Sequence, residues 1–126
     1  MNIHGKINYV EFHAADLVKT KAFFADAFNW EFTDYGPDYT AFSGEGLDGG
    51  FFKSDKLSVG DDGAPLIIFY SDNLEDTLAA VEAAGGAVNR AIFDFPGGRR
   101  FHFKEPSANE FAVWSDRTAS GKANET

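Results

Sequence analysis

The sequence predicts an α+β domain made of two tandem βαβββ modules. In each half of the 126-residue chain, a strand pattern precedes an amphipathic helix pattern, and three short strand patterns follow. The expected helix starts, Asp16 and Asp72, are 56 residues apart (72 − 16), and the expected helix ends, Asn29 and Gly85, are also 56 apart (85 − 29). Regular duplication of one supersecondary unit is a strong indication of fold. We therefore expect eight strands in two curved sheets, each with one helix.

Module one is expected to span about residues 5–60. Its first strand is residues 6–14, where apolar and polar residues alternate. Asp16 is suited to cap a helix at residues 17–28, in which Phe and Ala recur at helical spacing. Asn29 tolerates the left-handed conformation that ends many helices. Gly, Pro and Asp residues then divide three short strands, at 30–36, 39–44 and 49–53.

Module two is expected to span about residues 64–116. Its first strand, residues 65–71, is apolar on both faces, so we expect both faces to be covered. A second amphipathic helix at residues 73–84 begins after Asp72 and ends at Gly85. Three further strands follow, at 87–95, 99–104 and 110–115.

Length and composition limit the class of protein. Residues 1–116 are expected to form one domain, followed by a disordered tail at 117–126 that has no apolar residue larger than alanine. The formal charge of −9 argues against nucleic acid, and the pair Arg99 and Arg100 is too small a basic cluster to bind it. No apolar stretch approaches the ~20 residues that span a bilayer. The chain has no cysteine and no signal-peptide pattern, so we expect a cytoplasmic protein.

Three stretches carry a resemblance to a known family: AADLVKTKAFFADAFNWEF, SDNLEDTLAAVEAAGGAV and GGRRFHFKEPSANEFAVWS. In this order and spacing they resemble the vicinal oxygen chelate superfamily, which includes glyoxalase I, bleomycin-resistance proteins and extradiol dioxygenases. The resemblance covers roughly residues 5–116. It implies two curved mixed sheets around a concave pocket, with the helices outside. It also implies a homodimer with the pocket near the interface, since many members of the family are dimers.

The last stretch is similar to the family's Phe-x-Asp-Pro-Asp-Gly-Asn turn, with three departures. Glu105 stands for the first Asp, Ser107 for the second and Ala108 for Gly. A Gly in such a turn usually supplies a positive φ, which costs a residue with a side chain. We therefore expect Asn109 to take the left-handed conformation in place of the glycine.

The resemblance also implies a divalent metal site, which this sequence does not reproduce. Enzymes of the family hold the metal with His, Gln or Glu side chains on equivalent strands. The matching positions are Tyr9, Leu66 and Ala112, and within residues 48–52 only Asp48 could bind a metal. Leu66 and Ala112 cannot coordinate, so we expect no metal cofactor. An alternative is an unorthodox site, whose donors would be Glu11 and Glu110 with His13 or His102.

Glu11 is the residue of most interest for ligand binding or catalysis. If Val10 and Phe12 lie under the first helix, strand alternation turns Glu11 into the concavity beside Tyr9. Glu11 is then either a solvated or salt-bridged carboxylate, a residue that orients a ligand, or a general base. By the same alternation, Phe101, Phe103, Phe111 and Val113 belong to the core. The expected ligand contacts are Tyr9, Glu11, Leu66, Tyr70, Glu110, Ala112 and Trp114.

Three functions follow from these observations. The first is metal-independent binding of a small aromatic or cationic ligand near a dimer interface. The second is an enzyme, a lyase, isomerase or dioxygenase, that uses a displaced metal or acid–base chemistry through Glu11. The third is a structural or regulatory module whose pocket is filled by its own side chains.

Overall fold

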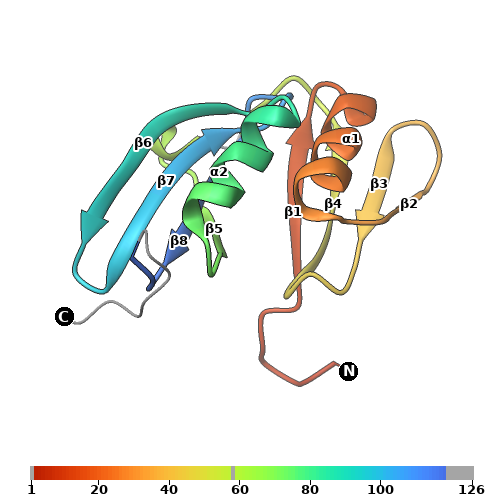
Figure 1. The fold of residues 1–126 in the computed structure, drawn as a ribbon. Helices are drawn as coiled ribbons and strands as arrows, with labels where there is room; N and C mark the ends of the chain where they lie inside the picture. The colour runs from red at the N-terminus through yellow and green to blue at the C-terminus, as the bar shows by residue number, and fades with distance from the viewer. Residues whose placement is uncertain (1, 58, 119–126) are drawn as a thin grey trace.

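A computed structural model describes residues 2–57 and 59–118 of the chain. Within them, the expected two βαβββ modules are confirmed (Figure 1). The elements of module one are β1 (Tyr9–Ala14), α1 (Leu17–Phe28), β2 (Phe32–Asp34), β3 (Tyr39–Phe42) and β4 (Asp48–Lys53). A short 3-10 helix, η1 (Gly60–Asp62), precedes module two. The elements of module two are β5 (Ile67–Tyr70), α2 (Leu74–Ala83), β6 (Ala87–Phe95), β7 (Gly98–Lys104) and β8 (Glu110–Ser115). Residues 119–126 of the expected tail lie outside the described residues.

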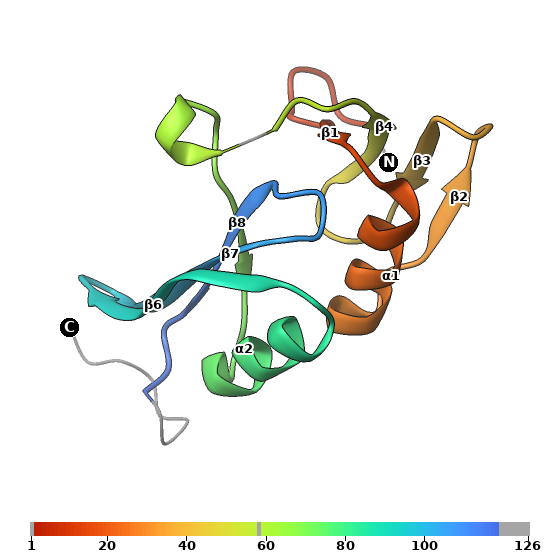
Figure 2. The same ribbon diagram turned by 90° about the horizontal axis from the view of Figure 1, so that it is seen from above.

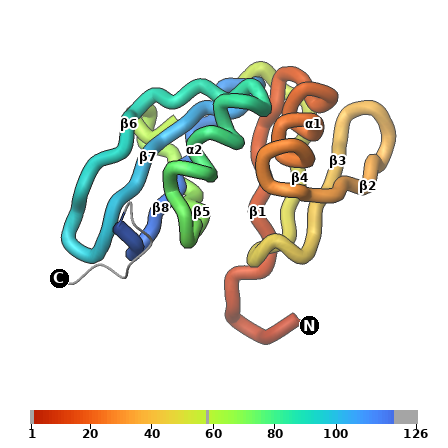
Figure 3. Tube along the Cα trace, in the orientation of Figure 1, coloured from red at the N-terminus to blue at the C-terminus, as the bar shows by residue number. Residues whose placement is uncertain are grey.

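Each module forms its own four-stranded mixed sheet. The strand orders are β1-β4-β3-β2 and β5-β8-β7-β6, so the two sheets have the same topology. In each sheet the first strand pairs in parallel with the last, and the remaining pairs are antiparallel. The tube in Figure 3 shows β1 and β5 as the edges at which the two sheets face each other. Seen from above, both helices lie on one side of the sheets, and η1 lies on the other (Figure 2).

The caps of α1 are as expected. The Asp16 side chain accepts a hydrogen bond from the Lys19 N–H at 3.0 Å, and Asn29 ends the helix with a φ of 62°. The expected cap of α2 is wrong by one residue. Asn73, not Asp72, has the extended backbone of an N-cap and accepts from the Asp76 N–H at 3.1 Å. The distance between the two N-caps is therefore 57 residues (73 − 16).

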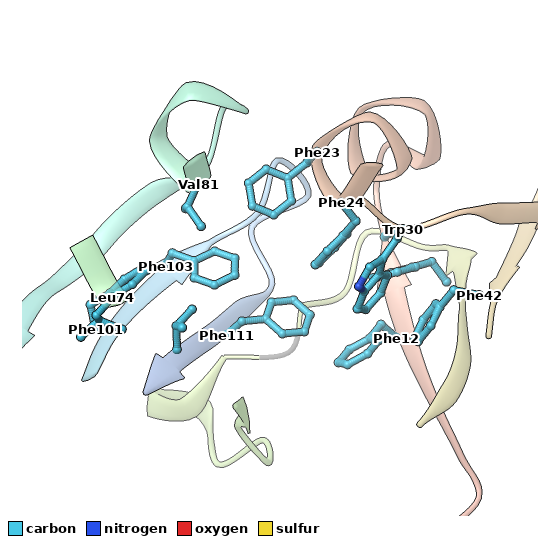
Figure 4. Packing of buried hydrophobic residues seen from close by; sticks show 13 residues of the cluster. Phe12, Phe23, Phe24, Trp30, Phe42, Leu74, Val81, Phe101, Phe103 and Phe111 are labelled. Carbon is cyan, nitrogen blue, oxygen red and sulfur yellow. The ribbon is translucent and has the colours of Figure 1, made fainter. Parts of the chain in front are cut away.

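One aromatic core joins the two modules. Phe24 on α1 lies 5.5 Å from Phe51 of its own module and 5.4 Å from Phe111 of the other, measured between ring centroids. Phe28 stacks on Phe69 at 4.4 Å, and Figure 4 shows the rings of both modules meeting between helices and sheets. The expected core residues of module two are confirmed, because the side chains of Phe101, Phe103, Phe111 and Val113 are all buried. Since each large ring buries ~150–250 Å², neither module has a complete core alone.

The expectation that both faces of the β5 strand are covered is wrong for the single chain. Ile67 and Phe69 pack against the core, whereas Ile68 and Tyr70 on the opposite face are 42% and 51% exposed. The helices cover only one face of each sheet. The other face of β5 therefore presents apolar and aromatic surface to its surroundings.

A turn of module two is inserted at the start of the first helix of module one. This interface turn, residues 105–109, joins β7 to β8. Its Glu105 side chain is 2% exposed and accepts three hydrogen bonds, from the Thr20 hydroxyl at 2.6 Å and from the backbone N–H groups of Ser107 and Asn109 at 3.0 and 2.9 Å. Burial is the largest influence on this carboxyl and raises its pKa, although the three donors act in the opposite direction.

Other residues of the interface turn also bond to module one. The Asp16 N–H donates to the Ser107 hydroxyl at 3.0 Å, and the Asn109 side-chain amide donates to the His13 carbonyl at 2.6 Å. The left-handed residue of the turn is Ala108, with a φ of 70°, and not Asn109 as expected. The reason is geometric. The Ala108 N–H bonds back to the Glu105 carbonyl, so the reversal falls at Ala108, and Asn109 already pairs with Glu105 across the closing strands.

Replacing Glu105 with Ala is expected to lower the free energy of unfolding by about 2–4 kcal/mol, because it removes the acceptor of the Thr20 hydroxyl and leaves two buried backbone N–H groups, those of Ser107 and Asn109, unsatisfied. The Thr20 hydroxyl keeps the Ser107 hydroxyl as a partner. Urea unfolding, followed by circular dichroism, measures this change. Glu31→Ala, which removes an exposed carboxylate, is the control and should change the value by less than about 0.5 kcal/mol. Equal effects of the two substitutions would contradict the structural role of Glu105.

Candidate functional site

A hollow of about 340 Å³ lies on the face of the module-one sheet that is turned away from α1. We call it the tyrosine hollow. It is lined by Tyr9, Thr33, Tyr35, Tyr39, Ala41, Phe42, Ser43 and Asp48. The alternation expected for β1 is confirmed, because Phe12 is buried in the core, whereas Tyr9 and Glu11 are exposed on the opposite face. The tyrosine hollow and Glu11 therefore lie on one surface.

Hydrogen bonds connect Tyr9, Tyr39 and Glu11. The Tyr39 hydroxyl donates to Glu11 Oε2 at 3.1 Å, and the hydroxyls of Tyr9 and Tyr39 are in short contact. A phenol has one proton, so Tyr39 uses it on Glu11 and Tyr9 donates to Tyr39. A carboxylate can accept about four hydrogen bonds. Glu11 therefore keeps most of its acceptor capacity for a ligand.

Tyr39 reaches Glu11 because Gly50 has no side chain. Gly50 lies between Glu11 and Ala41 in the sheet register, and a Cβ at this position would be 2.2 Å from the Tyr39 hydroxyl oxygen. Sequence reasoning missed Tyr39 as a site residue. Its only signal was Gly49–Gly50 within a strand, a pattern that often marks close approach of another group.

Tyr39 remains a hydrogen-bond donor at neutral pH. Its burial, followed by its hydrogen bonds with Tyr9 and Glu11, raises the pKa of the phenol far above its ordinary value of about 10. The three groups thus form a fixed array with a neutral phenol beside a carboxylate. Under physiological conditions Tyr39 is not present as a phenolate.

Asp48 adds a second carboxylate to the tyrosine hollow. It is the first residue of β4, pairs in register with Tyr9, and accepts a hydrogen bond from the Gly44 N–H at 3.1 Å. Tyr35 is exposed at the rim of the hollow. The tyrosine hollow therefore combines three phenol rings with Asp48 and the adjoining Glu11.

The expected ligand contacts of module two lie elsewhere. Leu66 and Tyr9 are equivalent positions in the two modules, because each lies seven residues before the N-cap of the following helix. Leu66 is half-buried and immediately precedes β5. Ala112 is fully buried and has no polar group to offer. Trp114 lies 5.2 Å from Tyr70 between ring centroids.

Glu110 has a structural set of partners. Its carboxylate accepts hydrogen bonds from the Gly60 N–H at 2.8 Å, from the Asn89 amide at 3.0 Å and from His102 Nδ1 at 3.2 Å. Burial raises the pKa of this carboxyl, but the three donors outweigh it and the net pKa is lowered. Glu110 thus stays ionised and anchors η1 to the sheet. The expectation that Glu110 and Glu11 contact one ligand in the same pocket is therefore not met, because Glu110 lies outside the tyrosine hollow.

The structure also divides the single expected concavity. Trp114 lines a separate hollow of about 270 Å³, the tryptophan hollow, together with Ile68, Phe95 and Arg100. Between the edges β1 and β5 lies a third, mainly apolar space of about 470 Å³, which reaches down to the core rings of Phe12 and Phe111 and is also lined by Glu45. Because the two sheets are not hydrogen-bonded to each other, their outer faces do not merge into one wall.

The side chains described do not fit a divalent metal. Residues 2–57 and 59–118 contain no cluster of three or more His, Asp or Glu side chains that could hold an ion. Leu66 and Ala112 provide no donor at two family positions. The unorthodox site considered from the sequence is not assembled either. His102 forms a hydrogen bond with Glu110, whereas the His13 ring packs against Phe52, with 4.2 Å between ring centroids. Among the described residues, no helix has the length and apolar character needed to cross a membrane.

The family model for the Glyoxalase/Bleomycin resistance protein/Dioxygenase superfamily matches residues 6–113. The chain belongs to this superfamily. The match spans both modules, in agreement with the repeated topology and with the resemblance of the three sequence stretches. No curated protein matches the sequence.

Solved structures share the fold at low sequence identity. A glyoxalase-related enzyme from Fulvimarina pelagi has a TM-score of 0.75 at 13% identity, covering 97% of this chain and 99% of the other. A lactoylglutathione lyase from Agrobacterium tumefaciens has a TM-score of 0.67 at 21% identity, with coverages of 88% and 93%. A fosfomycin resistance protein from Listeria monocytogenes, in a mutant form complexed with Mn(II) and a dihydroxypropylphosphonic acid, has a TM-score of 0.70 at 22% identity, with coverages of 90%. These likenesses show the fold alone.

The pKa of Tyr39 is raised, and the hydrogen bond to Asp116 also raises that of Tyr70. Alkaline titration followed by absorbance at 295 nm should therefore reveal late-ionising phenols, one of which disappears in Tyr39→Phe. Tyr35→Phe, the control, should retain it. Because this pKa is raised in the folded state, the contribution of Tyr39 to stability is constant below about pH 10 and falls as the pH rises further. A titration of Tyr39→Phe that contains as many late-ionising phenols as the parent would show that the Tyr9–Tyr39–Glu11 array is wrong.

Proposed function

We propose that this protein binds a small organic cation in the tyrosine hollow and that binding does not require a resident metal ion. The observation that carries the proposal is the fixed Tyr9–Tyr39–Glu11 array, with Asp48 on the same surface. The hollow, about 340 Å³, is of the size that accepts a small molecule.

Two physical effects favour a positively charged ligand. The faces of aromatic rings attract cations by ~0.5–2 kcal/mol each, depending on how far the charge is removed from water. Glu11 and Asp48 supply negative charge beside three such rings, and Tyr39 orients the Glu11 carboxylate by its hydrogen bond. A ligand with a flat or apolar body and an ammonium group would meet both features.

The chemistry of the side chains supports independence from a metal. At the positions that resemble the family's ligands, Leu66 and Ala112 have no donor atom, and Tyr9 uses its proton on Tyr39. A cationic ligand would itself supply the positive charge that Glu11 and Asp48 can neutralise. Of the three functions considered from the sequence, a pocket filled by its own side chains is the least supported, because the tyrosine hollow is open.

A second candidate function is acid–base catalysis by a lyase or isomerase. The chain of hydrogen bonds from Tyr9 through Tyr39 to Glu11 favours it, because such an array places a carboxylate base next to a neutral phenol acid. Glu11 would take a proton from the substrate as the general base, and the Tyr39 hydroxyl would hold its carboxylate in place. Exchange of substrate protons with solvent deuterium, lost in Glu11→Gln, would support catalysis over simple binding.

Replacement of Glu11 with Gln is expected to weaken binding of benzylammonium, a primary ammonium with N–H donors that is used as a probe, about tenfold to hundredfold. The reason is the loss of a charge-assisted contact worth ~1.5–3 kcal/mol. Calorimetric titration measures the affinity. The control is Glu31→Gln, which removes the same charge at an exposed position outside the tyrosine hollow and should leave the affinity within twofold. Benzoate or benzyl alcohol binding as tightly as the cation, or equal effects of the two variants, would overturn the proposal.

We also propose that the protein is a homodimer paired through the exposed face of β5, because large exposed apolar patches are uncommon on monomers. Light scattering should give a mass of twice 13.8 kDa. Tyr70→Lys, at a side chain that is 51% exposed on the same face, is expected to shift the protein towards the monomer. Val18→Lys on α1, where the side chain is 73% exposed, is the matched control and should not. A parent protein that scatters as a monomer at micromolar concentration would contradict this proposal.

A further inference from the structure

Two consecutive arginines on β7 have opposite environments. Side chains of adjacent strand residues point to opposite faces, so Arg99 turns towards α2, and Arg100 turns to the outer face. Arg99 Nη1 and Nη2 bond to the two Glu75 oxygens at 2.5 and 3.0 Å, and this carboxylate raises the pKa of the guanidinium. In the part of the chain that the structure describes, no carboxylate pairs with Arg100, and its buried Nε has no hydrogen-bond partner.

Aromatic rings surround the unpaired guanidinium. The Arg100 Cζ lies 5.5 Å from the ring centroid of Phe93 and 5.9 Å from that of Phe95. Arg90, also on this face, places its Cζ 3.7 Å from the centroid of Phe93. Two guanidinium groups therefore share one aromatic ring. Stacking on a ring holds the plane of a guanidinium while leaving its N–H groups available at the edge.

Arg100 opens onto the tryptophan hollow. Trp114 is its register partner on β8, and Phe95 lies 6.3 Å from Trp114 between ring centroids. The other lining residue, Ile68, is apolar. Of the four residues that line this hollow of about 270 Å³, Arg100 alone is charged. The hollow thus combines two aromatic rings and an isoleucine with a cationic fork.

We propose that the tryptophan hollow is a second binding site, which takes an organic carboxylate with a flat apolar body. The planar guanidinium matches a carboxylate with two parallel hydrogen bonds, a geometry that a lysine ammonium cannot reproduce. The indole of Trp114 and the ring of Phe95 offer faces against which such a body stacks. In a chain with a net charge of −9, the arginines on this face supply the local attraction for an anion. This site lies in module two and is separate from the cation site proposed in module one.

The test uses 2-naphthoate as the probe and calorimetric titration of the full-length protein. The matched pair of variants is Arg100→Gln and Arg99→Gln, which remove the same charge from neighbouring positions on opposite faces. Arg100→Gln should weaken binding at least tenfold, and Arg99→Gln should leave it within twofold. Arg100→Lys, which keeps the charge but loses the fork, should fall between the parent and Arg100→Gln. This third variant keeps the test valid if Arg100→Gln does not fold.

Several outcomes would overturn the proposal. They are an absence of naphthoate binding, equal weakening by Arg99→Gln and Arg100→Gln, or binding of the neutral 2-naphthamide as tightly as the acid. Binding by a monomeric Tyr70→Lys protein but not by the parent dimer would also overturn it, because the second copy would then cover the hollow. Glu11→Gln should leave naphthoate affinity unchanged, so failure of the cation site and failure of this site are distinguishable.

Discussion

The buried carboxylate of Glu105 is the interaction on which the arrangement of the molecule depends. It accepts hydrogen bonds from a side chain of the first module and from the backbone of its own turn. Ser107 and Asn109 extend the same contact to the end of β1 and the start of α1. Since this polar contact sits beside the shared aromatic core, it holds the last hairpin of the chain against the first helix. The orientation of one sheet relative to the other follows from this contact and the core together.

The position of the hollows is a consequence of that arrangement. Helices and core occupy one face of each sheet, so polar and aromatic groups suited to ligands remain on the other. The two modules repeat one topology, yet their outer faces differ in charge. Module one presents Glu11 and Asp48 among phenols, whereas module two presents Arg90 and Arg100 among other aromatic rings. Equivalent positions in the repeat therefore do not imply equivalent chemistry.

Local signals were sufficient to predict the fold but not the full site. Asp16 and Asn29 set the bounds of α1, and strand alternation correctly divided Phe12 from Glu11. The position of Tyr39 over Gly50 could not be read from the sequence, because it depends on the register between β3, β4 and β1. The burial of Glu110 depends on η1, whose Gly60 is 50 residues away in sequence and donates a hydrogen bond to the Glu110 carboxylate. Asp72 and Asn73 are both good capping residues, and only the backbone distinguishes them.

The interface turn also has a consequence for how the chain is made. Thr20 and Glu105 are 85 residues apart in sequence, and Asp16 and Ser107 are 91 apart. During synthesis α1 leaves the ribosome long before residues 105–109, which form hydrogen bonds with its N-terminal residues. It also leaves before Phe111, which packs against its Phe24 ring. Contacts of such long sequence separation slow folding and expose apolar surface in the meantime. The first module therefore cannot complete its hydrogen bonds and its core until almost the whole chain has been synthesised.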